Sequence, residues 1–183
     1  MTERTVAPPA IRTRPCRESD LDTLDRIFPS PSVNSFHRER YRLQTEGAAT
    51  YLIGWAGGVP IGHALIKWDG CADAEVRRAH PDCPEINGLV VADELRSRGV
   101  GSLLIGEAER WAVSRGRASI GLGVADVNPR ARALYERLGY AGEVGYLDRY
   151  TCVDSLGTVH RFADPCVFLV RALPRERMGR VTS

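Results

Sequence analysis

A glycine-containing turn near the middle of the chain has the composition of an anion-binding site. Gly99 and Gly101 closely follow Arg96 and Arg98, where an apolar stretch gives way to a helical pattern. Backbone N–H groups at the start of a helix bind anions, most often phosphate. Glycines let the backbone approach such a ligand because they carry no Cβ atom. The turn is therefore a candidate phosphate cradle; the alternative is an ordinary connection between a strand and a helix.

Two common nucleotide-binding motifs do not fit this turn. The P-loop motif requires a lysine directly after its second glycine, and the only lysine of the chain is Lys67. The Rossmann motif requires a third glycine, where this chain has Leu104, and it normally follows the first strand. A plain nucleotide-binding module is therefore disfavoured.

The segments around the turn have the patterns of alternating strands and helices. An apolar run over residues 85–92 suits a buried strand, and apolar residues at helical spacing predict a helix over residues 102–115. Alternation of glycine and apolar residues over 117–125 predicts a second strand. Asn128 and Pro129 are a favourable cap and first residue for another helix.

The order and spacing of these motifs resemble the GCN5-related N-acetyltransferase (GNAT) superfamily. Arg96, Gly99 and Gly101 match that family's pyrophosphate motif, Gln/Arg-x-x-Gly-x-Gly/Ala. Asn128 and the sequence ALYERLGY of residues 133–140 match its later signature. The resemblance implies an α/β (α+β) fold, a mixed central sheet of about six to seven strands flanked by about four helices.

The resemblance also implies acetyl-CoA as the acyl donor, with no metal. The turn would bind the pyrophosphate, and its residues are Arg96, Ser97, Arg98, Gly99, Val100, Gly101 and Ser102. In the preceding strand, Leu89, Val90 and Val91 would bind the rest of the donor. The N–H of Leu89, freed at a bulge or splay that Gly88 favours, would bind the thioester carbonyl, and Val91 would pair with the pantetheine arm. Asn128 would contact the pantetheine or an ordered water as well as cap its helix.

Acetyl transfer to an amine also needs a base and an acid. A free alkyl amine has a pKa near 10 and must lose a proton before it can attack. Glu85 is the candidate base, because strand periodicity puts it on the face of Leu89, four residues later. Tyr135 matches the tyrosine that gives the family's departing thiolate a proton. The alternatives are that Glu85 only begins its strand at the surface and that Tyr135 only packs in the core.

The sequence thus predicts an acetyl-CoA-dependent N-acetyltransferase whose acceptor amine attacks directly in a ternary complex. The acceptor is a small-molecule amine or a peptide amine. Acidic residues in the segment 69–84 favour a small cationic amine, unless that segment is only a solvated surface loop. The alternative function is a non-catalytic acyl-CoA sensor or regulatory module, which would not need Glu85 and Tyr135.

Outside the central motifs, the patterns predict one domain. Residues 11–173 would form a single acetyltransferase domain, with a disordered tail over residues 1–10 and a second tail over residues 174–183. The further expected elements are strands at 11–15, 51–55, 59–68, 142–150 and 162–172, helices at 19–28 and 34–46, a loop at 69–84, and a hairpin or loop at 151–161.

Composition limits the partners and the location. The net charge of +2 gives no argument for nucleic acid or a membrane surface, and the chain has no run of about 18 apolar residues. With no secretory signal pattern, we expect a cytoplasmic protein. The cysteines are odd in number, lack a Cys-x-x-Cys pair and are expected to be reduced thiols: Cys16, Cys71, Cys83, Cys152 and Cys166. A homodimer is suggested only by analogy with the family.

Overall fold

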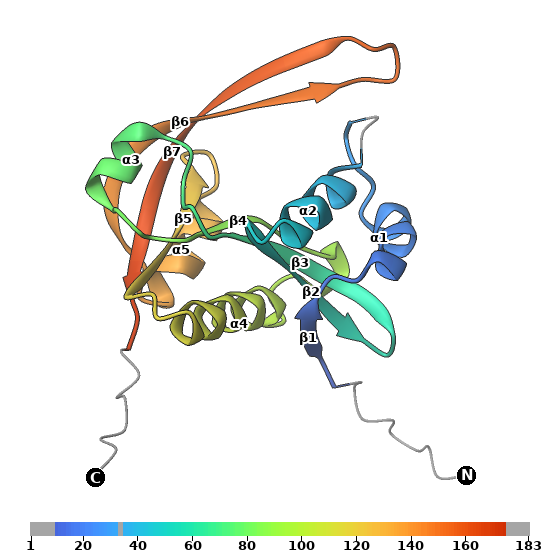
Figure 1. Ribbon diagram of the computed structural model, residues 1–183, viewed down its shortest axis with the longest axis horizontal. Coiled ribbons are helices and arrows are strands. Elements are labelled where there is room, and N and C mark those ends of the chain that lie inside the picture. Colours follow the sequence, from blue (N-terminus) through green and yellow to red (C-terminus); the bar gives the residue numbers. More distant parts are fainter. Residues whose placement is uncertain (1–9, 33–34, 175–183) are drawn as a thin grey trace.

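A mixed sheet of seven strands forms the centre of the computed structural model, which describes residues 10–32 and 35–174 (Figure 1). The strands are β1 (Arg12–Pro15), β2 (Ala49–Ala56), β3 (Val59–Lys67), β4 (Glu85–Val91), β5 (Ser119–Ala125), β6 (Ala141–Val153) and β7 (Val159–Ala172). Their order in the sheet is β1-β2-β3-β4-β5-β7-β6, and every neighbouring pair is antiparallel except β4 and β5. The predicted α/β class with a mixed sheet is confirmed.

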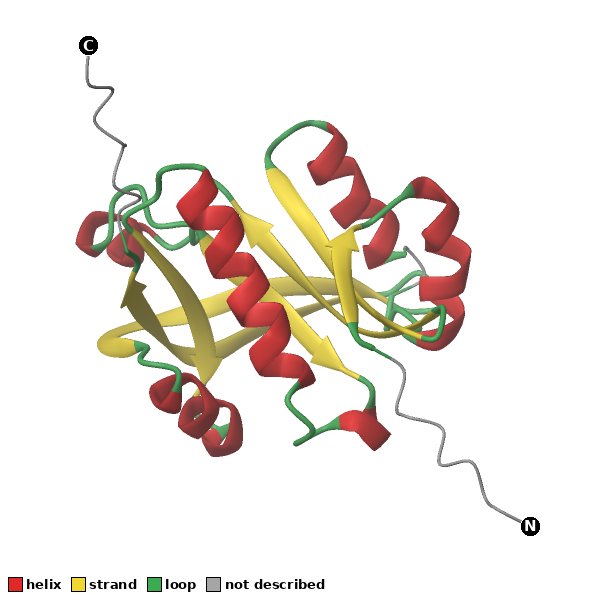
Figure 2. Ribbon diagram, turned by 90° about the horizontal axis from the view of Figure 1, so that it is seen from below, coloured by secondary structure: helices red, strands yellow, loops and turns green. Residues whose placement is uncertain are grey.

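Five α-helices cover the two faces of this sheet in the described residues. They are α1 (Leu21–Ile27), α2 (Phe36–Thr45), α3 (Ala74–Ala79), α4 (Val100–Ser114) and α5 (Pro129–Arg137), with short 3-10 turns at Glu18–Asp20 and Asp93–Leu95. Helix α4 lies across one face (Figure 2). Its buried residues share a core with those of α5, whereas α1 and α2 pack over β2 and β3 on the other face. The sheet therefore separates two sets of helices.

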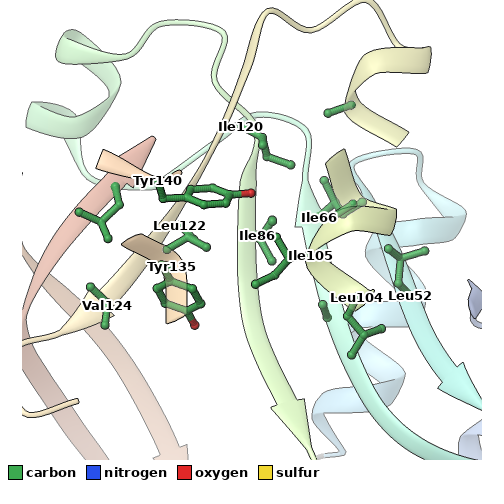
Figure 3. Packing of buried hydrophobic residues seen from close by; sticks show 14 of the residues in the cluster. Leu52, Ile66, Ile86, Leu104, Ile105, Ile120, Leu122, Val124, Tyr135 and Tyr140 are labelled. Carbon is green, nitrogen blue, oxygen red and sulfur yellow. The ribbon is translucent and has the colours of Figure 1, made fainter. Parts of the chain in front are cut away.

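Helix α4 is held by the apolar stripe that its sequence predicts. Leu104, Ile105, Ala108 and Ala112 are fully buried and pack against residues of β2 to β5 (Figure 3). Burial of each large aliphatic side chain contributes roughly 1.5–3 kcal/mol. The helix begins at Val100, two residues before the predicted start, because Gly99 has a positive φ of 86° and takes the capping position. This stripe fixes the turn before α4 against the sheet.

The segment 69–84, which we expected to be a loop, contains helix α3. Asp73 caps this helix by accepting hydrogen bonds from the backbone N–H groups of Glu75 and Val76. The helix was missed because its six residues are too few for a recognisable apolar period. The described residues therefore contain five α-helices where about four were expected.

The last two strands are longer than predicted and form one hairpin. Strands β6 and β7 stay paired through the polar segment 151–161, as far as the pair Val153 and Val159. That segment reads as a possible loop because both faces of its strands are largely exposed, so the sequence has no apolar alternation there.

The expected tails, residues 1–10 and 174–183, fall almost entirely outside the described residues. The expected start of the second helix at residue 34 also lies outside them; Ser35 caps α2. None of the helices in the described ranges is long and apolar enough to cross a membrane.

Candidate active site

The irregularity expected in strand β4 is present at Gly88. Two residues of β4, Gly88 and Leu89, stand opposite a single residue of β3, and Gly88 has a φ of +58°. Such a bulge leaves one residue without its ladder partner and bends the strand. The bulge therefore presents backbone polar groups near the middle of the sheet.

Strands β4 and β5 part almost as soon as they meet. They are paired only at Glu85 with Gly121 and at Ile86 with Leu122, and they diverge beyond these residues (Figure 3). The inner edges of two diverging strands have N–H and C=O groups free to bind an extended ligand. The splay lies beside the bulge. Beyond Ile86, β4 has no paired residues on β5, and we refer to this unpaired part of the sheet as the opening.

The turn before α4 leads from this opening to the start of the helix. Arg96, Ser97, Arg98 and Gly99 are exposed, and α4 begins at Val100. The first N–H groups of a helix have no acceptor within the helix and can bind an anion. Ser97 also has a positive φ, 63°, which turns the backbone sharply before the helix. The phosphate-binding role of this turn stays a prediction.

The charges of the turn are partly compensated by its neighbours. Arg96 forms an exposed ion pair with Asp93, 2.6 Å apart, and Arg130 of α5 donates a hydrogen bond to the hydroxyl of Ser97. Arg98 is exposed. The turn therefore combines free backbone donors with a moderate positive field.

Gly101 leaves room between three elements. A Cβ atom at this position would lie 3.6 Å from Leu134 of α5, 3.9 Å from Val91 and 4.0 Å from Leu89 of β4. A methyl group would fit at these distances, but a longer side chain would extend into the space between α4, α5 and the bulged strand. Gly101 therefore lies directly beside Leu89 and Val91, two of the predicted donor-binding residues.

Helix α5 begins as predicted and places Tyr135 beside the splay. The Asn128 side chain accepts a hydrogen bond from the N–H of Ala131 at 3.1 Å, and Pro129 is the first helical residue. Tyr135 is 9% exposed and packs in the core that α4 shares with the sheet. Its hydroxyl points away from Tyr140, and burial raises the pKa of this phenol (Figure 3).

Glu85 is buried at the start of β4 rather than exposed. Its exposure is 3%, and its carboxylate accepts hydrogen bonds from Lys67 at 3.0 Å and from the Asn87 amide at 3.4 Å. Buried carboxylates are normally paired in this way. Glu85 is therefore a fixed acceptor that still has lone pairs to offer.

The expectation that Glu85 and Leu89 share a face of the strand is wrong. Glu85 and Asn87 line a cleft on one side of the sheet, whereas the Leu89 side chain packs against the core on the α4 side. The extra residue at the bulge reverses the alternation, because the period of two holds only along regular strand. The backbone at Leu89 nevertheless remains on the strand that carries Glu85.

The cleft above Glu85 has a volume of about 250 Å³ and lies between the sheet, the segment before α3, and β6. Its lining residues are Lys67, Cys71, Ala72, Asp73, Ala74, Glu85, Asn87, Tyr146, Leu147, Asp148 and Arg149. Lys67 and Glu85 form its floor as an ion pair. This cleft is the candidate site for the second substrate.

Sequence reasoning missed Tyr146 as a member of this cleft. A Cβ atom on Gly123 of β5 would lie 1.9 Å from the Tyr146 hydroxyl, so the glycine makes room for the phenol beyond the splay. Burial, followed by the negative charge of Glu85, raises the pKa of Tyr146 above its usual value. The glycine alternation in residues 117–125 was the available signal, since glycine in a strand often marks a close approach.

Three of the four acidic residues of the segment 69–84 have partners within the segment. Asp73 caps α3, Asp69 pairs with Arg77 at 3.2 Å, and Glu75 pairs with Arg78. These partners reduce the negative field that the segment can offer a cationic ligand, and the acceptor preference stays a prediction. Within the described residues, no group of three or more His, Cys, Asp or Glu side chains could hold a metal ion.

Comparisons with known proteins agree with this geometry. The acetyltransferase (GNAT) family model matches residues 18–140. An uncharacterized N-acetyltransferase of Methanocaldococcus jannaschii is 32% identical over 83 residues, which are 45% of this chain and 35% of that protein. This chain therefore matches only about a third of the length of that relative.

Solved structures with low sequence identity share the fold. NAA60 of Arabidopsis thaliana, in complex with a bisubstrate analogue, has a TM-score of 0.66 at 19% identity, covering 90% of this chain and 98% of that one. YncA of Salmonella typhimurium, a putative acetyltransferase with its cofactor acetyl-CoA, has a TM-score of 0.64 at 15% identity, covering 94% and 99%. The ribosomal-protein-S18-alanine N-acetyltransferase of Escherichia coli has a TM-score of 0.63 at 16% identity, covering 95% and 99%.

The family model covers well over half of the chain, including the bulged strand, the turn before α4 and helix α5. From its sequence motifs and its fold together, this chain belongs to the acetyltransferase (GNAT) family.

Proposed function

We propose that the protein transfers an acetyl group from acetyl-CoA to a primary amine by direct attack in a ternary complex. The observation that carries this proposal is the opening formed by the β4 bulge and the β4–β5 splay, with the start of α4 beside it. Acetyl-CoA, when bound, supplies an activated acyl carbon. The chain must hold that donor, orient the amine and move two protons.

The donor side of the opening fits an extended ligand that ends in a pyrophosphate. The backbone of Leu89, Val90 and Val91 would bind the extended arm at the edge of β4. The turn residues from Arg96 to Ser102 would bind the pyrophosphate through their N–H groups. Asn128, which is exposed at the start of α5, would contact the arm or an ordered water. The space beside Gly101 supports this assignment.

The catalytic steps are assigned to three groups. The N–H of Leu89 would donate a hydrogen bond to the acyl oxygen as negative charge develops there. Glu85 would accept a proton from the amine, directly or through water, and Tyr135 would donate a proton to the departing thiolate. Glu85 is buried in the cleft and Tyr135 on the α4 side of the sheet, which supports entry of the two substrates from opposite faces.

The acceptor is a small-molecule or peptide amine. The structure of NAA60 contains a bisubstrate analogue, and the E. coli neighbour is named a ribosomal-protein-S18-alanine N-acetyltransferase. These neighbours support an amine acceptor but do not indicate which amine this chain uses. A small cationic amine, predicted from the acidic segment 69–84, has weaker support because Asp69 and Glu75 form ion pairs and Asp73 caps α3. A cytoplasmic location, a homodimer and a single domain over residues 11–173 stay predictions.

The alternative is an acyl-CoA-binding sensor without catalysis. Such a protein would need the opening and the turn but not a buried carboxylate in the cleft or a phenol beside the splay. The presence of both Glu85 and Tyr135 favours the enzyme.

Calorimetric titration with acetyl-CoA, followed by CoA release with a panel of amines, tests the proposal. We expect the wild-type protein to bind acetyl-CoA with a Kd in the micromolar range. The affinity of Gly101→Glu should be at least about tenfold lower, because a charged side chain would lie between α4, α5 and β4. Gly106→Glu is the matched control, since a Cβ atom there meets nothing within 4 Å. Equal binding by both variants would overturn the cradle, and binding without CoA release for any amine would support the sensor.

A further inference from the structure

Three arginines of helix α2 differ in what they pair with. Arg38 pairs with Asp22 at 2.7 Å, and Arg42 pairs with Glu39 at 2.7 Å, both at exposed positions. Arg40 is only partly exposed, and among residues 10–32 and 35–174 no carboxylate pairs with it. A guanidinium that is withdrawn from water without an anionic partner is costly unless a ligand supplies the anion.

A network of neutral groups fixes the orientation of Arg40. Its Nη1 donates to His63 Nδ1 at 3.1 Å, and its guanidinium carbon lies 5.6 Å from the centre of the Tyr51 ring. The guanidinium carbon lies 4.6 Å from the centre of the Phe36 ring. These partners satisfy some of the donors of Arg40 and leave its charge uncompensated.

The Phe28 carbonyl can only accept a hydrogen bond, and this fixes the proton positions in the network. The Phe28 carbonyl lies 2.7 Å from His37 Nε2, so this nitrogen must carry the proton. His37 Nδ1 then accepts from the Tyr51 hydroxyl at 2.5 Å. These hydrogen bonds fix the Tyr51 ring, which lies beside the Arg40 guanidinium and helps to hold its orientation.

The free end of Arg40 lies at the bulge. A Cβ atom on Gly88 would lie only 2.1 Å from Arg40 Nη2, and Gly88 itself is exposed. The next residue is Leu89, whose N–H is the proposed donor to the acyl oxygen. The positive charge thus lies against the strand one residue from the place where the amine must attack.

We propose that Arg40 binds a carboxylate of the acceptor, so that the substrate class is amines that carry a nearby carboxylate, with free α-amino acids as the simplest members. Consecutive Cα atoms are 3.8 Å apart, so a group held on Arg40 at Gly88 is within a few ångströms of Leu89. The amine and carboxylate of an α-amino acid share one carbon atom and match this short span. Arginine suits the task because its planar fork binds both oxygens of a carboxylate.

This inference rests on the proposed acetyl transfer and narrows its acceptor. It replaces the small cationic amine that the acidic segment suggested with an acceptor that has an anionic group beside its amine.

The test compares matched acceptors in the intact protein. CoA release is measured with the standard L-amino acids, with their carboxamides, and with the corresponding amines that lack the carboxylate. We expect kcat/KM to be about 100-fold higher for at least one amino acid than for its carboxamide. Removal of one partner from an ion pair that is withdrawn from water typically has an effect of this size. Equal turnover of an acid, its amide and its simple amine would overturn the proposal.

Variants of α2 assign the effect to Arg40. Arg40→Met should remove the preference for the carboxylate, with about 100-fold lower kcat/KM for the amino acid, little change for the carboxamide and unchanged acetyl-CoA affinity. Arg40→Lys should retain part of the preference, and Arg42→Met, an exposed arginine of the same helix, should retain all of it. An equal loss for every acceptor, or a loss of acetyl-CoA affinity, would show that Arg40 only supports the bulge.

Two readouts separate this inference from the proposed function. If acetyl-CoA does not bind the wild-type protein, the proposed function fails first. If acetyl-CoA binds, calorimetry with N-acetyl amino acids and their amides tests the carboxylate site without turnover. Tighter binding of the acids than of the amides is expected, and equal or absent binding of both would overturn the carboxylate site alone. The comparison uses the wild-type chain, so it stands even if Arg40→Met is unstable.

Discussion

The surroundings of Tyr135 and Glu85 support the opposite proton transfers that we propose for them. Tyr135 packs in the α4 core, where burial raises its pKa, whereas Glu85 lies in the cleft as the partner of Lys67. A phenol with a raised pKa keeps its proton in the neutral range and can donate it. A carboxylate held by a lysine has oxygen atoms available to accept one.

Tyr135→Phe should lower kcat by about 100-fold, the range of a lost general acid, and leave acetyl-CoA affinity unchanged. Because burial raises the pKa of Tyr135, the wild-type kcat should show no fall from tyrosine ionisation below about pH 10. Tyr140→Phe is the control: its hydroxyl donates to Glu109 at 2.9 Å, so this variant should lose stability and keep its turnover. Equal kcat in the wild type and Tyr135→Phe would remove the assigned role.

Glu85→Gln should lower kcat/KM at pH 7 by about 100-fold, since glutamine keeps the hydrogen bond from Lys67 but cannot take a proton. The ratio of wild-type to Glu85→Gln kcat/KM should fall as the pH rises towards the pKa of the amine, which is about 10 for a simple alkylamine. Near that pH the acceptor loses its proton without help from a base. The measurement is a pH profile of both proteins at limiting acceptor. A defect of constant size at every pH would instead indicate a purely structural ion pair.

At the scale of elements, the bulge of β4 lies between the two substrate sites that we propose. It reverses the side-chain alternation, so that Glu85 faces the cleft while Leu89 and Val91 pack towards α4. It also brings Gly88 against the guanidinium of Arg40. The bulge at Gly88 thus separates the residues of β4 that face the proposed donor site from those that face the proposed acceptor site.

Gly88→Ala should destabilise the fold and slow catalysis. The φ of +58° costs an alanine about 1–2 kcal/mol, and its methyl group would displace Arg40. Gly145→Ala on β6 is the matched control, because a Cβ atom there meets nothing within 4 Å, and it should change stability by less than about 0.5 kcal/mol. Urea unfolding and kcat measure the two effects; a Gly88→Ala protein as stable and active as the control would contradict the assigned role of the bulge.

At the scale of the whole molecule, segments far apart in the chain enclose the acceptor side. The hairpin of β6 and β7 extends beyond the sheet towards the connection between α1 and α2 (Figure 1). There the Ser32 hydroxyl bonds to the backbone of Val153 at 3.2 and 3.3 Å, and the Cys152 thiol donates to the Pro31 carbonyl at 3.2 Å. The acceptor side is therefore bounded both by the first helices and by the last strands.

Sequence alone determined the features that depend on near neighbours in the chain. The cap at Asn128, the turn at Gly99 and the apolar stripe of α4 follow from local hydrogen bonding and helical periodicity. Their fixed order, together with Gly88, was enough to predict the family, the mixed sheet and the irregularity in β4. Site roles assigned by resemblance, such as those of Leu89 and Tyr135, stay predictions.

Only the tertiary structure decided which distant residues meet. It showed that Glu85 and Leu89 face opposite sides, that Tyr146 fills the space over Gly123, and that Arg40 alone of three similar arginines reaches the bulge. These relations depend on strand register and on how helices pack against the sheet. A shift of one residue in register reverses every side chain of a strand, and local sequence does not fix that register.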